Sequence, residues 1–268
     1  MSLSKSFVLG QHYPGNSLVH RSSALVKLVA TIVVMVAIFV AAQAVQYMPI
    51  IIFLVVGIIL SHIPLRFFGR GLRPILFLII LTVFIQIFFT PGTPIWHLGF
   101  IRITREGIVL AGFILCRLVL LTLVSVLLTA STSPIELTDA ISDLLKPLSH
   151  IGLPSAEIAL VMSIAMRFVP TILEETERII RAQVSRGARI GEGSLVARMK
   201  SFIPILIPLF VSSFRRADDL AVAMEARGFR VGNPRTRYHE HHFHFFDACV
   251  LAGSIITLCG VIICRLFL

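Results

Sequence analysis

Charged residues are absent from two long stretches of this 268-residue sequence. No Lys, Arg, Asp or Glu occurs between Leu28 and Leu65, or between Pro74 and Ile101. Surface helices of soluble proteins carry a polar face, whereas one crossing of a hydrocarbon layer about 30 Å thick takes roughly 20 apolar residues. The missing charge therefore excludes a soluble globular enzyme and a disordered tail protein, and it predicts a polytopic membrane protein.

Cysteine is scarce and unpatterned, and the usual catalytic motifs are missing. The four cysteines lie inside apolar segments without a C-x-x-C pair, which excludes a disulfide scaffold. No Walker A motif occurs, so the chain cannot power transport by itself, and no Ser/His/Asp or Cys/His set stands out. We therefore expect no enzymatic activity and no cofactor. Residues 1–23 are polar and lack a small-residue cleavage pattern, so no cleavable signal peptide is predicted.

Five apolar segments are interpreted as membrane crossings. They are predicted at residues 25–46, 49–62, 74–89, 107–130 and 246–267. The segment Thr90–Pro94 has the Pro-Gly composition of a loop. Trp96 and Phe100 follow it and are placed near a membrane interface, where amphipathic aromatic side chains gather.

The distribution of Lys and Arg predicts the orientation. The basic residues near the first four spans are concentrated before the first span and between the second and third: Lys5, Arg21, Lys27, Arg66, Arg70 and Arg73. Basic loops remain on the cytoplasmic side, so the N-terminus is predicted to be cytoplasmic and the C-terminus to lie outside. The same placement argues against nucleic-acid binding, despite a formal net charge of +10.

Residues 131–240 differ from the rest of the chain, because they hold most of the acidic residues and over half of the basic ones. Their two apolar runs, Ile158–Met166 and Phe202–Phe210, are shorter than a crossing and have charged flanks. Ser133 and Pro134 form a helix start. We predict an all-α integral membrane protein with about five transmembrane helices and a cytoplasmic-side domain of about three helices. Its domains are 1–130 (N-terminal region and four spans), 131–240 (cytoplasmic helices) and 241–268 (last span).

A short internal repeat lies in this cytoplasmic region. Residues 181–189, RAQVSRGAR, align with residues 222–230, VAMEARGFR, 41 positions later. Each copy ends with a small residue, Arg and Gly, and with a second Arg three positions after the first. A glycine permits a sharp helix end, and the negative end of the helix dipole favours an arginine. One copy indicates only a common helix cap, but two matched copies favour docking into two similar sockets of a partner.

Other polar residues leave alternatives open. Arg117 lies in the middle of the fourth span, where a structural partner is favoured over a substrate role. Arg167 is bracketed by apolar residues and either anchors a helix at the lipid interface or forms an ion pair. Asp218 and Asp219 lack the second acidic motif that a membrane prenyl-transfer enzyme needs, and they are interpreted as helix-surface charge. The cluster His239, His241, His242 and His244 matches no compact zinc spacing, so a polar turn is favoured over a metal site.

Three stretches resemble the EcfT/CbiQ family, the transmembrane (T) component of energy-coupling factor (ECF) transporters. Residues 10–17, GQHYPGNS, followed by His20-Arg21 and Lys27-Leu28, resemble its opening signature, although Ser22–Leu25 stand where the family often has Leu-Asp-Pro-Arg. The stretches SIAMRFVPTILEETERIIRAQVSRGAR and FIPILIPLFVSSFRRADDLAVAMEARGFR are similar to its two coupling regions.

The resemblance implies the T subunit of an ECF-type ABC importer in a bacterial cell membrane. Such a subunit transmits ATP hydrolysis by two ATPase subunits, which bind the ATP, to a substrate-binding S component for uptake of vitamins or similar micronutrients. The implied ATPase-docking residues are Ser185, Arg186, Gly187, Ala226, Arg227 and Gly228. The implied apolar surface facing the S component consists of Phe202, Ile203, Ile205, Leu206, Ile207, Leu209, Phe210 and Phe214, with Pro204 and Pro208 bending the helix. The alternatives are a cobalt or nickel ECF importer, and a conventional ABC permease that binds substrate itself.

Overall fold

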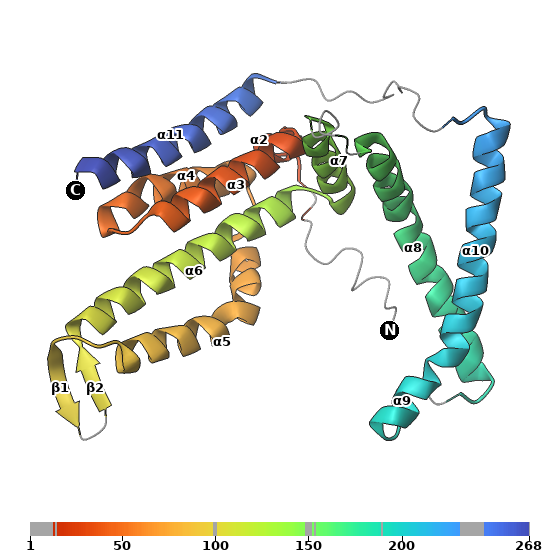
Figure 1. The fold of residues 1–268 in the computed structure, drawn as a ribbon, viewed down its shortest axis with the longest axis horizontal. Helices are drawn as coiled ribbons and strands as arrows, with labels where there is room; N and C mark the ends of the chain where they lie inside the picture. The colour runs from red at the N-terminus through yellow and green to blue at the C-terminus, as the bar shows by residue number, and fades with distance from the viewer. Residues whose placement is uncertain are drawn as a thin grey trace. The chain divides into compact units, whose positions relative to one another are not determined.

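The computed structural model describes residues 13, 15–98, 101–147, 152, 154–188, 190–230 and 244–267. This part of the chain is almost entirely helical, as predicted (Figure 1). The helices are α2 (Leu18–Arg21), α3 (Ala24–Val40), η1 (Ala44–Gln46), α4 (Tyr47–Ser61), α5 (Leu65–Phe89), α6 (Arg105–Ser131), α7 (Pro134–Leu145), α8 (Ser155–Ser185), α9 (Leu195–Ser201), α10 (Ile203–Ala226) and α11 (Phe245–Phe267). An antiparallel hairpin that was not predicted, β1 (Pro94–Leu98) and β2 (Ile101–Thr104), joins α5 to α6.

Six helices of the described residues are long and apolar enough to cross a membrane. They cover Ala44–Ser61, Leu65–Phe89, Arg105–Ser131, Ala156–Ser185, Leu195–Ala226 and Phe245–Phe267. Four of them correspond to the second to fifth predicted spans, and the first predicted span corresponds to α3, which has only 17 residues. The other two contain the apolar runs that were judged too short, because each helix continues beyond its run into charged sequence.

Two local predictions differ from the structure. The basic segment Arg66–Arg73, predicted as a loop, forms the first turns of α5, so Pro74 lies inside that helix rather than at its start. Gly69 and Gly71 lower the helix propensity of this segment, but neither adopts the positive φ that would end a helix. Residues 131–240 form four described helices rather than about three, because glycines with positive φ, Gly191 (+80°) and Gly193 (+91°), separate α9 from α8.

The chain divides into two compact units, which are described separately. The first, the bundle unit, contains residues 11–140 and 240–268, and the second, the crossed-helix unit, contains residues 141–239. The core of the bundle unit lies around α3, which contacts α4, α6 and α11. Buried alanines on α3, among them Ala30 and Ala37, leave room for close approach of these neighbours, as small residues do between membrane helices.

A buried carboxylate joins the beginnings of α3 and α11. Oδ1 of Asp247 accepts hydrogen bonds from the Ser22 hydroxyl (2.5 Å) and from the backbone N–H of Ser23 (2.9 Å). Oδ2 accepts one from the backbone N–H of His244 (3.0 Å). A negative charge is favourable at a helix N-terminus, and here one side chain caps two helices.

Basic side chains occupy helix C-termini in the same unit. The buried Lys27 donates from Nζ to the backbone carbonyl of Ser131, the last residue of α6 (2.9 Å). Arg117 donates from Nη2 to the carbonyl of Ala41 at the end of α3 (2.8 Å), and Arg265 donates to the carbonyl of Val40 (3.4 Å). The structural partner favoured for Arg117 is therefore a helix end of this chain.

Replacing Asp247 with Ala should destabilise the bundle unit, because it leaves a hydroxyl and two backbone N–H groups without their acceptor. We expect the free energy of unfolding to fall by about 3 kcal/mol. The measurement is thermal unfolding of the full-length protein in detergent. Asp219→Ala, at an exposed position of α10, is the control and should change the free energy by less than about 0.5 kcal/mol. Equal stability of the two variants would contradict this role for Asp247.

Candidate functional site

The repeat lies on two helices of the crossed-helix unit that run in opposite directions. The chain descends along α8, turns through α9 and returns along α10 (Figure 1). A hydrogen bond from the Gln183 side chain to the carbonyl of Pro204 (3.4 Å) places the end of α8 beside the start of α10. Because the helices are antiparallel, their C-terminal ends lie at opposite ends of the pair.

The end of α8 has a Schellman cap. Gly187 has a φ of +88°, its N–H donates to the carbonyl of Val184 (2.9 Å), and the N–H of Ala188 donates to the carbonyl of Gln183 (3.0 Å). This pair of bonds defines the motif, and a glycine adopts the left-handed conformation without strain. The prediction that Gly187 ends a helix is confirmed.

The end of α10 repeats the same geometry. Gly228 has a φ of +73°, its N–H donates to the carbonyl of Glu225 (2.9 Å), and the N–H of Phe229 donates to the carbonyl of Met224 (3.0 Å). The two copies of the repeat therefore share their backbone structure as well as their sequence, which confirms the predicted helix end at Gly228.

The two motif arginines are exposed at these ends. Arg186 and Arg227 occupy the C-cap positions with nearly equal backbone angles, φ −85° and −88°. Ser185 and Ala226 are the last residues of their helices, and both are exposed. Among the ion pairs of the described residues, none involves Arg186 or Arg227. Each guanidinium is thus held on a rigid helix end and can bind a carboxylate of another chain.

An apolar stripe follows one side of α10. Its exposed members recur at helical spacing and are Ile203, Leu206, Ile207, Phe210 and Phe214, with Phe202 just before the helix. The prediction that Ile205 belongs to this exposed surface is wrong, because the residue is only 4% exposed. Ile205, the half-buried Leu209 and Arg216 recur at helical spacing on another side of α10. Pro204 is in the first turn of α10 and Pro208 inside it, and the chain changes direction between α9 and α10 (Figure 1).

The side of α10 that carries Arg216 is tied to α8 by polar side chains that the sequence analysis did not single out. Glu175 of α8 forms an ion pair with Arg216 of α10 and accepts a hydrogen bond from the hydroxyl of Ser212. Glu175 and Arg216 are both half-buried, with 22% and 33% of their side chains exposed. The sequence held one indication of this contact: Glu175 and Arg216 are 41 residues apart, which equals the offset of the repeat.

The other polar candidates do not assemble into a site within the described part of the chain. Arg167 is exposed on α8, and Asp218 and Asp219 are exposed on α10, as expected of helix-surface charge. His239, His241 and His242 lie outside the described residues, and the backbone of His244 binds Asp247. Among the described residues, no three His, Cys, Asp or Glu side chains lie close enough together to hold a metal ion.

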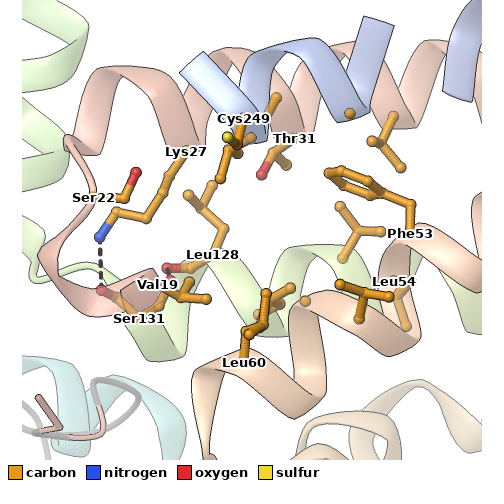
Figure 2. Close-up of a pocket in the computed structure, with 18 of the residues that line it drawn as sticks. Val19, Ser22, Lys27, Thr31, Phe53, Leu54, Leu60, Leu128, Ser131 and Cys249 are labelled. Atoms are coloured by element: carbon orange, nitrogen blue, oxygen red, sulfur yellow. Dashed lines mark hydrogen bonds between the residues drawn. The ribbon is translucent and has the colours of Figure 1, made fainter. Parts of the chain in front are cut away.

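The bundle unit contains a cavity of about 280 Å³ between α3, α4, α6 and α11. Figure 2 shows Lys27 and its bond to Ser131 at one end and Phe53 at the other. The described lining is mostly aliphatic, and its only metal-ligating side chain is that of Cys249. The described lining holds no His, Asp or Glu side chain, the usual nitrogen and oxygen ligands of cobalt and nickel ions.

Comparisons with known proteins agree over nearly the whole chain. A family model described as CbiQ, a cobalt transport protein, matches residues 15–238. The energy-coupling factor transporter transmembrane protein EcfT of Acidaminococcus fermentans is 48% identical over 259 residues, which cover 97% of this chain and 93% of the relative. Proteins of the same name from Ruminiclostridium cellulolyticum (45% identical, 97% of each chain) and Brevibacillus brevis (46%, 95% of this chain and 96% of the relative) are similar to the same extent.

Replacing Gly187 or Gly228 with Ala should open the helix caps, because an alanine is strained by about 1 kcal/mol at a positive φ. The capped amides, those of residues 187 and 188 or of 228 and 229, should then exchange about five times faster with deuterium. Gly112→Ala is the control, because Gly112 has a helical φ and open space at its Cβ position. It should leave exchange at both caps unchanged, and an unchanged rate in Gly187→Ala would show that the cap does not depend on glycine.

Proposed function

The chain belongs to the EcfT family, the transmembrane (T) subunits of energy-coupling factor transporters, and from this premise we propose that it couples ATP hydrolysis by two partner ATPases to a separate S component. A T subunit is a multi-pass membrane protein that works in a transporter complex. We call α8 and α10 the coupling helices. The observation that carries the proposed coupling role is the pair of matched, exposed Arg-Gly ends on these helices.

Each Arg-Gly end is suited to a charged socket on an ATPase subunit. The Schellman cap satisfies the last backbone groups of the helix, so the partner has to match only the small residue, the arginine and the glycine. The guanidinium of Arg186 or Arg227 would pair with acidic side chains there. Losing one partner of such a desolvated pair costs about 2–5 kcal/mol, enough to detach a subunit.

The apolar stripe of α10 supplies a second kind of contact. Its exposed Ile, Leu and Phe side chains offer no hydrogen bonds, which suits the apolar surface of a membrane-embedded S component. With the N-terminus in the cytoplasm, as the basic loops predict, the ATPases bind from the cytoplasmic side. ATP is held by those subunits, and this chain contributes no cofactor.

The imported substrate in this proposal is a vitamin or a similar micronutrient bound by the S component. The description of the matching family model as a cobalt transport protein favours a second candidate, a cobalt importer. In that case too the proposal assigns the bound ion to the S component.

Charge reversal at both Arg-Gly ends should release the ATPases. In Arg186→Glu combined with Arg227→Glu, we expect at least a tenfold loss of both ATPases in co-purification from membranes, since each lost pair removes more than about 1.4 kcal/mol. Thermal stability of the purified chain should be unchanged, because both side chains are exposed.

The matched control carries the same change of charge on the same helices. Arg178→Glu combined with Arg215→Glu alters two exposed positions away from the helix ends and should retain both ATPases. Retention of both ATPases by the Arg186/Arg227 variant would overturn the docking proposal.

Charge on the apolar stripe should release the S component instead. We expect Ile207→Glu combined with Phe210→Glu to co-purify with both ATPases but to lose the S component, because two carboxylates would have to be buried in an apolar contact. Val161→Glu, at a comparably exposed apolar position of α8, is the control. If the S component stays bound to the double variant, the stripe is not its docking surface.

A further inference from the structure

The crossing of α8 and α10 is held by a polar contact between two half-buried side chains. Glu175 of α8 has both carboxylate oxygens occupied, Oε1 by the Ser212 hydroxyl and Oε2 by a guanidinium nitrogen of Arg216. A guanidinium and a carboxylate are planar groups with directional bonds, so such a pair fixes where one helix lies along the other. An apolar crossing would hold this register less firmly.

Glu175 and Arg216 lie at equivalent positions outside the repeat, each six residues before one copy. The offset that aligns Arg186 with Arg227 is 41 residues, and the same 41 residues separate Glu175 from Arg216. When a two-fold axis relates two segments, a residue contacts the equivalent residue of the other segment only at the axis. The ion pair therefore marks a local two-fold axis between the antiparallel coupling helices.

The two helix ends lie at equal distances from this contact. Eleven residues separate Glu175 from Arg186 along α8, and eleven separate Arg216 from Arg227 along α10. At 1.5 Å per helical residue, each end is about 16 Å from the ion pair along its helix. Both ends also carry the same Schellman cap and expose the same arginine.

We propose that the Glu175–Arg216 ion pair is the pivot of the coupling helices, a positioning pair that fixes the spacing of the two Arg-Gly ends about a local two-fold axis. The partner that fits such an arrangement presents two like sockets related by the same axis, as a pair of similar ATPase subunits does. This inference rests on the proposed function for the identity of the partner. The pivot itself depends only on the geometry within this chain.

The pivot is tested by the distance between two spin labels at equivalent exposed positions, Ala182→Cys and Ala223→Cys. The full-length chain is studied in lipid nanodiscs after serine replaces the native cysteines, Cys116, Cys249, Cys259 and Cys264. Seven helical residues on each side of the pivot predict one narrow distance distribution centred at roughly 20–30 Å. Glu175→Gln should at least double its width. The exchange variant, Glu175→Arg with Arg216→Glu, should restore it.

Glu174→Gln, the neighbouring exposed carboxylate, is the matched control and should leave the distribution narrow. A Glu175→Gln distribution as narrow as that of the control would overturn the pivot, as would an exchange variant as broad as Glu175→Gln. If Glu175→Gln fails to fold, the exchange variant decides alone: a narrow distribution supports the pivot, and misfolding or a broad distribution overturns it.

A functional readout separates the pivot from the docking proposal. In the assembled transporter, Glu175→Gln should keep both ATPases but lower substrate uptake per ATP hydrolysed at least fivefold, and the exchange variant should recover uptake to within twofold of the native chain. Unchanged uptake per ATP in Glu175→Gln would overturn the coupling role. If the native chain does not bind the two ATPases, the proposed function is refuted. The spin-label distances would still decide whether Glu175 and Arg216 form the pivot.

Discussion

Charged side chains bonded to helix ends hold the bundle unit together. A bilayer offers no partner for the last carbonyls and first N–H groups of a helix, so the protein must supply them. Asp247 does so for the beginnings of α3 and α11, Lys27 for the end of α6, and Arg117 for the end of α3. These charges are tolerated because each is placed against the helix pole of opposite sign.

The docking proposed for the crossed-helix unit uses the same chemistry toward other chains. At its two ends the backbone satisfies itself through glycine caps, which leaves Arg186 and Arg227 available for other subunits. The apolar stripe of α10 adds a contact of another kind. In the proposed complex, charged contacts with fixed geometry bind the ATPases and the apolar stripe binds the S component.

Much of the fold could be predicted from the sequence because its strongest signals are local. Charge-free runs predict membrane spans, and an Arg-Gly pair after a helical stretch predicts a helix end, so four of the six spanning-length helices and both caps were found. The start of α5 and the hairpin before α6 were missed, because the basic loop and the Pro-Gly segment carry no signal that separates a loop from a regular element. Ile205 was misplaced and Glu175–Arg216 overlooked, because only the packing of α10 on α8 decides which side of the helix is covered.

The shortness of α3 has a consequence for the surrounding lipid. Its 17 residues reach about 25 Å, less than the roughly 30 Å of hydrocarbon in a typical membrane. A helix of that length facing lipid would force the bilayer to thin around it, at an energetic cost for every ångström of mismatch. One face of α3 is packed against α4, α6 and α11, but Ile32, Val36 and Phe39 on the other face are exposed, so the bilayer has to thin where it meets that face.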